Sequence, residues 1–307
     1  MIIISSTIGS SWFLNGISNL QQQIGLTNRQ LSSGYRVQDA ADSPAQTPEL
    51  VNLGASLAAV QAYQTKLARV QTEASGADQA LGSATSLLDS ARSLATQAAN
   101  TTTTPEERQS IAAAIQSIQQ QLVSLANTTV EGRYIFGGNL DQTAPYSFDT
   151  TTNTAIAQSS PTSVAVTTDT RNQPVYQPLT AQQIFDPVDA TGASTANSPF
   201  AALQNLQTAL ASGNQNPIAT SIAQLQNASG WLNQQQAYYG ESEQRLTAEQ
   251  TNASTQAVAI QTQIASIRDT DVTQAATDLA QETTTQAAAM GAESEILQQK
   301  NLFSYLG

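Results

Sequence analysis

The sequence predicts a mainly α-helical fold: a rod of long antiparallel coiled-coil helices from both chain ends, with a small β-containing central insert domain. Three observations support this prediction. Apolar residues recur in steps of three and four over long stretches of both halves of the 307-residue chain. Helix-favouring Ala, Gln and Leu are abundant, whereas only 5% of residues are aromatic, which disfavours a thick globular core. Between residues 133 and 198 the composition changes to Thr, Pro, Asn and Asp, which is typical of short strands and turns.

The first helix is expected over residues 10–31, before the turn Ser32-Ser33-Gly34. Its apolar stripe consists of Ile17, Leu20, Ile24 and Leu31, with Thr27 filling the missing step. A polar loop follows as far as Thr47-Pro48, which predicts an N-cap followed by proline in the first helical position. The loop therefore separates a short terminal helix from a longer one.

The second helix carries the longest periodic pattern of the chain. Its apolar positions are Leu53, Leu57, Val60, Tyr63, Leu67, Val70, Ala74, Ala77, Leu81, Ala84, Leu88 and Ala91. The mean spacing is near 3.5 residues, which favours a seam against other helices, and the many Ala positions allow a close approach. After a Thr-rich link, Thr104-Pro105-Glu106-Glu107 predicts a capping box for a third helix. The apolar face of this helix consists of Ile111, Ile115, Ile118, Leu122 and Leu125.

The insert is expected over residues 133–198, with β-type pieces at 134–136, 146–148 and 164–167. Five prolines interrupt it, at positions 145, 161, 174, 178 and 187. A disordered linker is the alternative interpretation of the same composition.

Helical patterns resume at Ser198-Pro199. One face carries Phe200, Leu203, Leu206 and Leu210. After Gly213 a further helix is expected from Ile218 to about Ile267, and polar residues 268–271 interrupt it. A last amphipathic stretch holds Leu279, Met290, Leu297 and Leu302. These patterns divide the chain into an N-terminal helix and loop, a helical rod, the insert, returning helices and a C-terminal helix, at residues 1–47, 48–132, 133–198, 199–268 and 269–307.

The two terminal helices carry few large apolar residues. Burying a Leu or Ile contributes about 1.5–3 kcal/mol, while ordering one backbone residue costs about 1–2 kcal/mol. We therefore expect these helices to fray in the monomer and to become ordered against neighbouring subunits. A self-contained intramolecular bundle is the alternative. Trp12 and Trp231, each inside a helical stretch, are expected to be packing residues.

Several functional classes lack the residues they need. The chain has no His and no Cys, so an ordinary zinc site, a thiol nucleophile and a Ser-His-Asp triad are excluded. The close carboxylates Asp269 and Asp271, and likewise Asp186 and Asp189, are expected to be surface or capping residues. No catalytic residue, metal or cofactor is predicted, and the protein is not expected to be an enzyme. The net charge of −12 disfavours nucleic acid and anionic membrane as partners. No apolar run is long enough for a transmembrane helix, and the start has no basic region of a cleaved signal peptide.

Several stretches resemble the flagellin superfamily. Residues 31–44, Leu-Ser-Ser-Gly-Tyr-Arg-Val-Gln-Asp-Ala-Ala-Asp-Ser-Pro, are similar to its N-terminal signature, and residues 267–272 with 296–299 are similar to its terminal helix. Residues 132–138, 139–146 and 301–306 resemble the branch of the family found at the junction between hook and filament. The similarity spans roughly residues 10–145 and 198–307. Ser43 stands where the family loop usually has a second acidic residue.

The resemblance implies a structural adaptor of the bacterial flagellum that joins hook to filament, with flagellin itself, the filament subunit, as the alternative. It implies export of the unfolded chain through the flagellar type III channel, an extracellular location and a homo-oligomeric ring. The partners would be a hook-associated protein on the hook side, flagellin, and a cytoplasmic chaperone that binds the C-terminal region. A family variant with a metalloprotease insert is excluded because the chain has no His. An unrelated secreted helical effector is the remaining alternative.

The resemblance also implies which residues make assembly contacts. These are Ile17, Leu20, Ile24, Leu31, Leu279, Met290, Leu297, Leu302, Phe303 and Leu306. The loop that carries the family motif contains Ser33, Gly34, Arg36, Asp39, Asp42 and Pro44.

Overall fold

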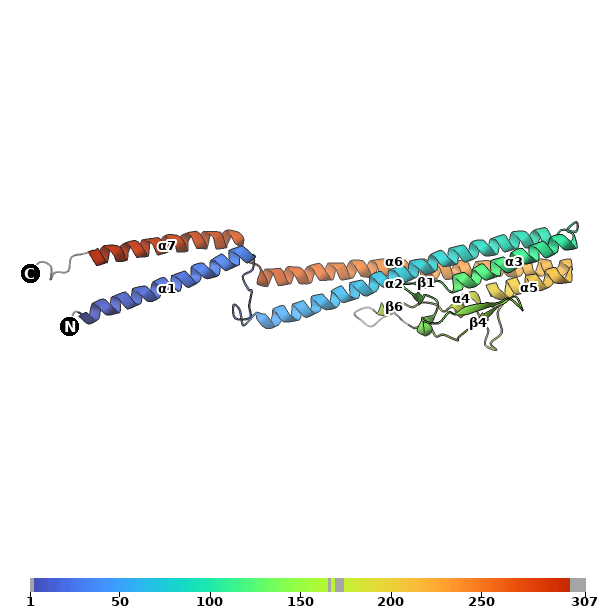
Figure 1. Ribbon diagram of the computed structural model, residues 1–307, viewed down its shortest axis with the longest axis horizontal. Coiled ribbons are helices and arrows are strands. Elements are labelled where there is room, and N and C mark those ends of the chain that lie inside the picture. The colour runs from blue at the N-terminus through green and yellow to red at the C-terminus, as the bar shows by residue number, and fades with distance from the viewer. Residues whose placement is uncertain (1–2, 165–166, 169–173, 299–307) are drawn as a thin grey trace, which may run out of the picture. The chain divides into compact units, whose positions relative to one another are not determined.

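The structure is a computed structural model that describes residues 3–164, 167–168 and 174–298. Long helices dominate it and short strands occupy the middle of the chain (Figure 1). The α-helices are α1 Ile3–Ser33, α2 Thr47–Ala98, α3 Pro105–Ala126, α4 Ala181–Phe185, α5 Pro199–Ser212, α6 Gln215–Arg268 and α7 Val272–Gln298. The strands are β1 Thr129–Val130, β2 Arg133–Tyr134, β3 Tyr146–Asp149, β4 Thr154–Ala157, β5 Thr167–Thr168 and β6 Pro174–Tyr176, and a 3-10 turn η1 covers Gly138–Leu140. The predicted fold class is confirmed. None of the described helices combines the length and apolar character needed to cross a membrane.

The described residues form two compact units. The terminal unit contains residues 3–60 and 256–298, and the central unit contains the described residues between 61 and 255. Helices α2 and α6 contribute to both units.

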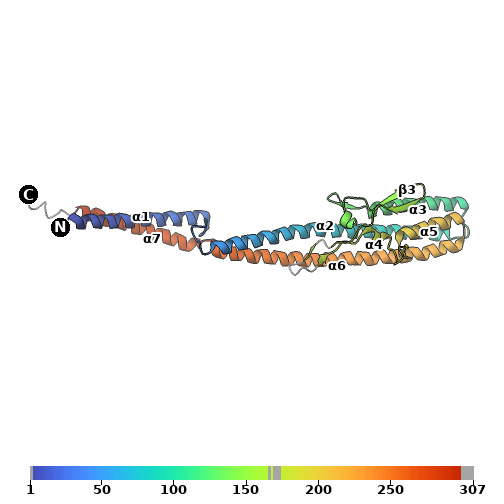
Figure 2. The same ribbon diagram turned by 90° about the horizontal axis from the view of Figure 1, so that it is seen from below.

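In the central unit a helical seam forms the core. Helices α2 and α6 lie side by side in both views, and α3 packs on α5 (Figures 1 and 2). Tyr63 on α2 donates a hydrogen bond to the Glu249 carboxylate on α6 over 3.3 Å, and Gly82 lies opposite Gln236, so the two helices run antiparallel. Ten apolar α2 positions are at most 1% exposed: Leu67, Val70, Ala74, Ala77, Leu81, Ala84, Leu88, Ala91, Ala95 and Ala98. The apolar face that the spacing predicts from Leu67 onward is thus the buried face of α2.

Helix α3 begins as predicted. The Thr104 hydroxyl accepts a hydrogen bond from the Glu107 N–H (3.2 Å), and the Glu107 carboxylate accepts one from the Thr104 N–H (2.8 Å). Three of the predicted face positions, Ile111, Ile115 and Leu122, are at most 5% exposed. The capping box therefore fixes where α3 begins, and the apolar spacing of the helix matches its buried face.

The insert consists of three two-stranded antiparallel sheets, β1–β2, β3–β4 and β5–β6. Glu131 and Gly132 both have positive φ (51° and 77°) and form the tight turn between β1 and β2. The predicted piece at 146–148 lies within β3, the piece at 134–136 overlaps β2, and the piece at 164–167 falls partly on residues outside the description. The β-containing insert is confirmed, and the linker interpretation is wrong for these described strands.

Aromatic side chains attach the insert to the helices. The Phe136 ring lies edge-on to Phe185 (centroids 5.7 Å apart) and to Tyr239 of α6 (6.4 Å). The Tyr239 hydroxyl accepts a hydrogen bond from the Leu179 N–H over 3.1 Å. Trp231 of α6 donates its indole N–H to the Ile184 carbonyl (3.0 Å), which confirms its packing role.

Three sequence expectations about the N-terminal part need correction. Helix α1 begins at Ile3 instead of residue 10. Thr47 is already helical, and its hydroxyl donates to the Ser43 carbonyl (2.8 Å), so it is not an N-cap acceptor. Trp12 is 79% exposed and does not pack within the described chain, because α1 has a partner on only one of its faces.

Candidate functional site

No reactive site stands out in the described residues. Within them, no three Asp or Glu side chains converge in a way that could hold a metal ion. The features that set this chain apart lie in the terminal unit, in the pairing of α1 with α7 and in the loop between α1 and α2.

Helices α1 and α7 lie side by side and run antiparallel (Figure 1). The predicted stripe Ile17, Leu20 and Ile24 is half-buried against α7. The opposing α7 face is only partly apolar, because Glu282 and Gln286 are half-buried on the same side as Ala275 and Leu279. Thr27 takes the place of an apolar residue in this stripe, and its hydroxyl donates a hydrogen bond to the Glu282 carboxylate over 3.1 Å. The two helices therefore share a thin contact that is partly polar.

Large apolar side chains remain on the surface of the terminal unit. Trp12 is 79% exposed, Leu14 64% and Met290 52%. Leu26, Val51, Val258 and Val272 are exposed as well. Helix α1 carries one charged residue, Arg29, in 31 residues. An exposed apolar helix surface with so little charge is typical of an interaction surface.

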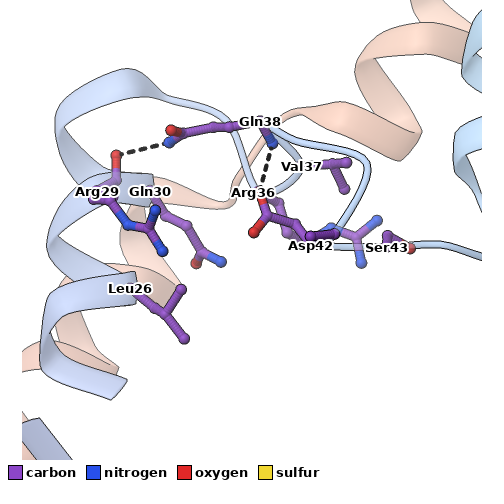
Figure 3. A pocket seen from close by; sticks show the side chains of 9 residues that line it. Leu26, Arg29, Gln30, Arg36, Val37, Gln38, Asp42 and Ser43 are labelled. Atoms are coloured by element: carbon purple, nitrogen blue, oxygen red, sulfur yellow. Dashed lines mark hydrogen bonds between the residues drawn. The ribbon is translucent and has the colours of Figure 1, made fainter. Parts of the chain in front are cut away.

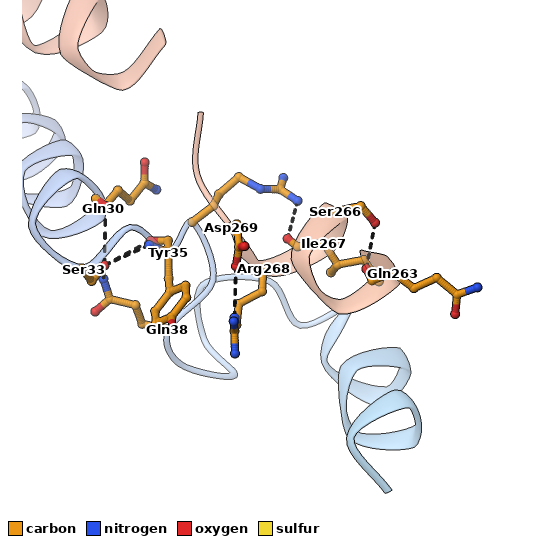
Figure 4. A network of polar contacts seen from close by, with 10 residues as sticks. Gln30, Ser33, Tyr35, Gln38, Gln263, Ser266, Ile267, Arg268 and Asp269 are labelled. Atoms are coloured by element: carbon orange, nitrogen blue, oxygen red, sulfur yellow. Dashed lines mark hydrogen bonds and ion pairs between the residues drawn. The ribbon is translucent and has the colours of Figure 1, made fainter. Parts of the chain in front are cut away.

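Residues 34–46 and 268–271, here called the elbow, connect α1 to α2 and α6 to α7. Tyr35 and Asp269 form an antiparallel bridge. The N–H groups of Arg36 and Val37 donate to the Arg268 carbonyl (2.7 and 3.1 Å), and the Thr270 N–H donates to the Gly34 carbonyl (2.9 Å). The backbone thus pairs the two connections, and Figure 4 shows Tyr35, Arg268 and Asp269 where they meet.

Side chains complete this pairing. The Arg36 guanidinium donates to the Ile267 carbonyl over 2.7 Å and so caps the last turn of α6. The Arg268 guanidinium lies 4.1 Å from the centre of the Tyr35 ring and forms an ion pair with Asp269 (3.2 Å). The Asp271 carboxylate accepts from the Thr273 and Gln274 N–H groups at 2.9 and 3.1 Å and starts α7.

The family-motif loop folds on its own side chains. Gly34 has φ +76°, and its N–H donates to the Gln30 carbonyl (2.8 Å), which ends α1 in a left-handed cap. The Asp42 carboxylate accepts from the Asp39 and Gln38 N–H groups, both at 3.0 Å. These donors, from Asp39 first and then from Gln38, lower the pKa of Asp42 below its ordinary value.

A hollow of about 430 Å³ opens between the end of α1 and this loop (Figure 3). Leu26, Arg29 and Gln30 line it from α1, and Arg36, Val37, Gln38, Ala41, Asp42 and Ser43 line it from the loop. Val37 is buried (7% exposed), whereas both arginines are exposed. The hollow therefore has two cationic groups and one carboxylate that is already committed to backbone donors.

The structure brings some predicted residues together and leaves others apart. Ile17, Leu20, Ile24, Leu31 and Leu279 are half-buried, and Met290 is exposed. Gly34, Arg36, Asp39, Asp42 and Pro44 belong to the elbow, and Ser33 is the last residue of α1. Leu297 belongs to the last turn of α7. Leu302, Phe303 and Leu306 lie outside the described residues. The roles assigned to all of these positions stay predictions.

Sequence reasoning missed the parts played by Tyr35, Gln38 and Arg268. Gln38 donates its amide to the Arg29 carbonyl over 3.2 Å, which ties the loop back to α1. Their contacts run to backbone groups or to residues far away in the sequence, so the residue types gave no signal of them.

The fold and sequence match known flagellar proteins. Residues 4–141 match the bacterial flagellin N-terminal helical region, and residues 222–306 match the bacterial flagellin C-terminal helical region. Flagellar hook-associated protein 3 of Escherichia coli (strain K12) is 29% identical over 226 residues, which cover 71% of this chain and 68% of that protein. Flagellar hook-associated protein 3 of Salmonella typhimurium is 34% identical over 136 residues, which cover 43% of this chain and 42% of that protein.

Solved structures agree on the fold. A putative flagellar hook-associated protein from Vibrio parahaemolyticus superposes with a TM-score of 0.61 at 19% identity, covering 74% of this chain and 100% of that one. The Bacillus cereus FlgL crystal structure gives a TM-score of 0.55 at 21% identity, covering 70% of this chain and 99% of that one. The two matched helical regions together span more than two thirds of the sequence, and they contain both helices of the α1–α7 pair. The chain therefore belongs to the flagellin family and is a structural component of the bacterial flagellum.

Proposed function

We propose that this chain is a structural subunit at the junction between the flagellar hook and the filament, where it joins the two without catalysing a reaction. The observation that carries the proposal is the terminal unit, whose paired helices expose Trp12, Leu14 and Met290. These apolar side chains have no cover within the described chain, and subunit packing would remove them from water. The naming of both curated relatives as flagellar hook-associated protein 3 supports the same assignment.

The subunits are proposed to form a homo-oligomeric ring through the terminal unit. The predicted contact residues Ile17, Leu20, Ile24, Leu31 and Leu279 would then gain burial beyond their present half-buried state. One side of the ring would meet a hook-associated protein and the other would meet flagellin. The chain would reach this extracellular site unfolded, through the flagellar export channel, with a cytoplasmic chaperone on its C-terminal region.

Deletion of the gene tests the junction role. Cells without the protein are expected to keep their hooks, to lack attached filaments and to release unpolymerised flagellin into the medium. Electron microscopy of the cell surface and immunoblotting of the medium measure these outcomes. If the chain were flagellin instead, deletion would remove the filament and leave no flagellin in the medium, and normal filaments would refute both roles.

Limited proteolysis tests folding on assembly. In the purified monomer we expect rapid trimming of about the first 30 and last 40 residues, because a thin, half-polar helix pair opens locally at low free-energy cost. The central unit should survive as a stable fragment. Digestion is followed by mass spectrometry, and termini as resistant as the central unit would contradict the proposal that assembly orders them.

A further inference from the structure

We propose that the hollow at the elbow is a receptor for a carboxylate on helix α7 of a second copy of this chain, with Arg29 as the cation that binds Glu293. The inference rests on the proposed self-association and names the contact that would carry it. The occupant is argued from the distribution of charge and of exposed apolar groups in the terminal unit.

Cations and anions are separated in this unit. Its described residues contain three cationic side chains, Arg29, Arg36 and Arg268, and all three lie at or beside the elbow. Helix α7 contains four carboxylates and no Lys or Arg between Val272 and Gln298, namely Asp278, Glu282, Glu293 and Glu295. Two copies placed with the elbow of one against α7 of the other would therefore bring opposite charges together.

Of the three arginines, Arg29 is the one that remains available to bind an anion. Arg36 is held by the Ile267 carbonyl, and Arg268 by the Tyr35 ring and Asp269. The Arg29 guanidinium has no hydrogen bond or ion pair with any described residue, and it acts on Asp42 only through space. Since Asp42 already accepts two backbone N–H groups, the hollow keeps an excess of positive charge (Figure 3).

The α7 carboxylates likewise differ in whether they already have a hydrogen-bond partner. Glu282 accepts from the Thr27 hydroxyl, and Asp278 accepts from the Gln274 amide over 2.7 Å. Glu293 and Glu295 have no such partner among the described residues. Glu293 follows the exposed Met290 by three residues, as Arg29 follows the exposed Leu26 by three. Residues three apart on a helix are surface neighbours, so an apolar group accompanies the charge on both sides of the proposed contact.

The two patches cannot meet within one copy. Thr27 lies opposite Glu282, and Glu293 is eleven residues further along α7, which amounts to about 16 Å at 1.5 Å per residue. One copy therefore presents the Arg29 cation near its elbow and the Glu293 carboxylate far from it. Such a head-to-tail contact joins unlike surfaces and propagates until the copies close into a ring or continue as a helix.

A charge swap in the full-length protein tests the contact. Arg29→Glu and Glu293→Arg should each weaken self-association by about tenfold or more, since each puts like charges together. The double variant Arg29→Glu/Glu293→Arg should return to within about threefold of the wild type, because the pair is restored in reverse. Sedimentation velocity over a concentration series measures the association, and circular dichroism checks the helix content of each variant. Higher salt should weaken the wild-type contact.

Arg92→Glu is the matched control, because it makes the same charge change on the central unit, where Arg92 pairs with Asp89 at 3.5 Å. It should leave association unchanged. Self-association that survives both single reversals, or a double variant as weak as the singles, overturns the Arg29–Glu293 contact while leaving the junction role to the deletion experiment. A wild-type chain that stays monomeric at every concentration also overturns the contact, and hooks with shed flagellin in the deletion strain would still support the junction role.

Discussion

The seam of the central unit and the α1–α7 pair of the terminal unit follow the same spacing but reach different degrees of burial. On α2, apolar residues three and four apart, such as Leu67, Leu81 and Leu88, are at most 1% exposed. On α1, the equally spaced Ile17, Leu20 and Ile24 remain half-buried. The difference lies in the partner, since α2 faces Leu, Ala and Tyr residues of α6, whereas α1 faces Glu282 and Gln286. Spacing therefore predicts which face of a helix is apolar, and the opposing helix decides how far it is buried.

The two units also differ in the number of elements that pack around their helix pairs. The central unit adds α3, α5 and the aromatic cluster around Phe136 to its helix pair, so its apolar groups have neighbours on several sides. In the terminal unit, by contrast, α1 and α7 pack on each other without such added layers among the described residues. If this comparison is right, the same kind of substitution should cost much more in one unit than in the other.

The largest effect is expected for Phe136→Ala. The ring is fully buried between Phe185 and Tyr239, so its removal leaves a cavity and should cost about 3–5 kcal/mol of central-unit stability. Urea unfolding followed by the fluorescence of Trp231, which is hydrogen-bonded within this unit, measures the loss. A change below about 1 kcal/mol would mean that the insert is not part of the central core.

A matched pair of isoleucines sharpens the comparison directly. Ile115→Ala, at a site with 0% exposure on α3, should cost about 2–5 kcal/mol. Ile24→Ala, at a half-buried site on α1, should cost about 1 kcal/mol in the monomer. Hydrogen exchange resolves the two helices separately. Equal costs at both sites would remove the distinction between the units.

A smaller effect is expected at the end of α1. Gly34 has φ +76° and open space where a Cβ would lie, so Gly34→Ala should cost about 1–2 kcal/mol through backbone strain alone. Gly25→Ala is the control, because Gly25 is helical with equally open space and should instead gain up to about 1 kcal/mol. The rate of proteolysis at α1 measures the effect of each of the two substitutions. A harmless Gly34→Ala would argue against the left-handed cap.

The smallest effect is a pH response of opposite sign in the two units. The folded pKa of Asp42 lies below its unfolded value of 3.8, so its contribution is present above that pH and is lost as the pH falls through the folded pKa. The pKa of Glu73 is raised above 4.5 by burial, so protonation as the pH falls through that raised value favours the folded central unit.

Hydrogen exchange of the loop amides at a series of pH values separates these responses. Acidification below about pH 4 should lower the protection of the Gln38 and Asp39 amides relative to their intrinsic exchange rates, and Asp42→Asn should remove that pH dependence. In the central unit, Glu73→Gln should remove the gain on acidification. Loop exchange that is insensitive to acid in the wild type would show that the Asp42 contacts do not order the elbow.

The sequence predicted the long helices well because their signal accumulates over many turns. The α2 seam matched from Leu67 to Ala91 and the Thr104–Glu107 capping box matched in full, whereas the earlier seam positions Leu53, Leu57 and Tyr63 are half-buried. Helix α4 was missed because five residues are too short for periodicity, although Thr180 and Gln183 form a capping box that could have revealed it. Strands β1, β4 and β6 were missed because two to four residues in a Thr-rich stretch carry little pattern.

The elbow was predictable in part. Its motif was visible through family resemblance, but the residues that face it from the other end of the chain were not. The pairing of Gly34, Arg36 and Val37 with Arg268 and Thr270 uses backbone N–H and carbonyl groups, which every residue except proline possesses. Such contacts leave no residue-type signature. The exposure of Trp12 was equally hidden, because a sequence does not state which face of a helix lacks a partner.

The backbone pairing at the elbow has a mechanical consequence. A pull on α1 is not carried by the covalent chain of residues 34–46 alone, because the Gly34–Val37 segment is fastened to Arg268–Thr270 by three backbone hydrogen bonds. Tension directed along these antiparallel segments loads the three bonds together, as shear, and they resist more force than bonds peeled apart one after another. The covalent path through residues 38–46 is thereby bypassed, and force can pass between the amino-terminal and carboxy-terminal segments of the terminal unit at this fixed contact.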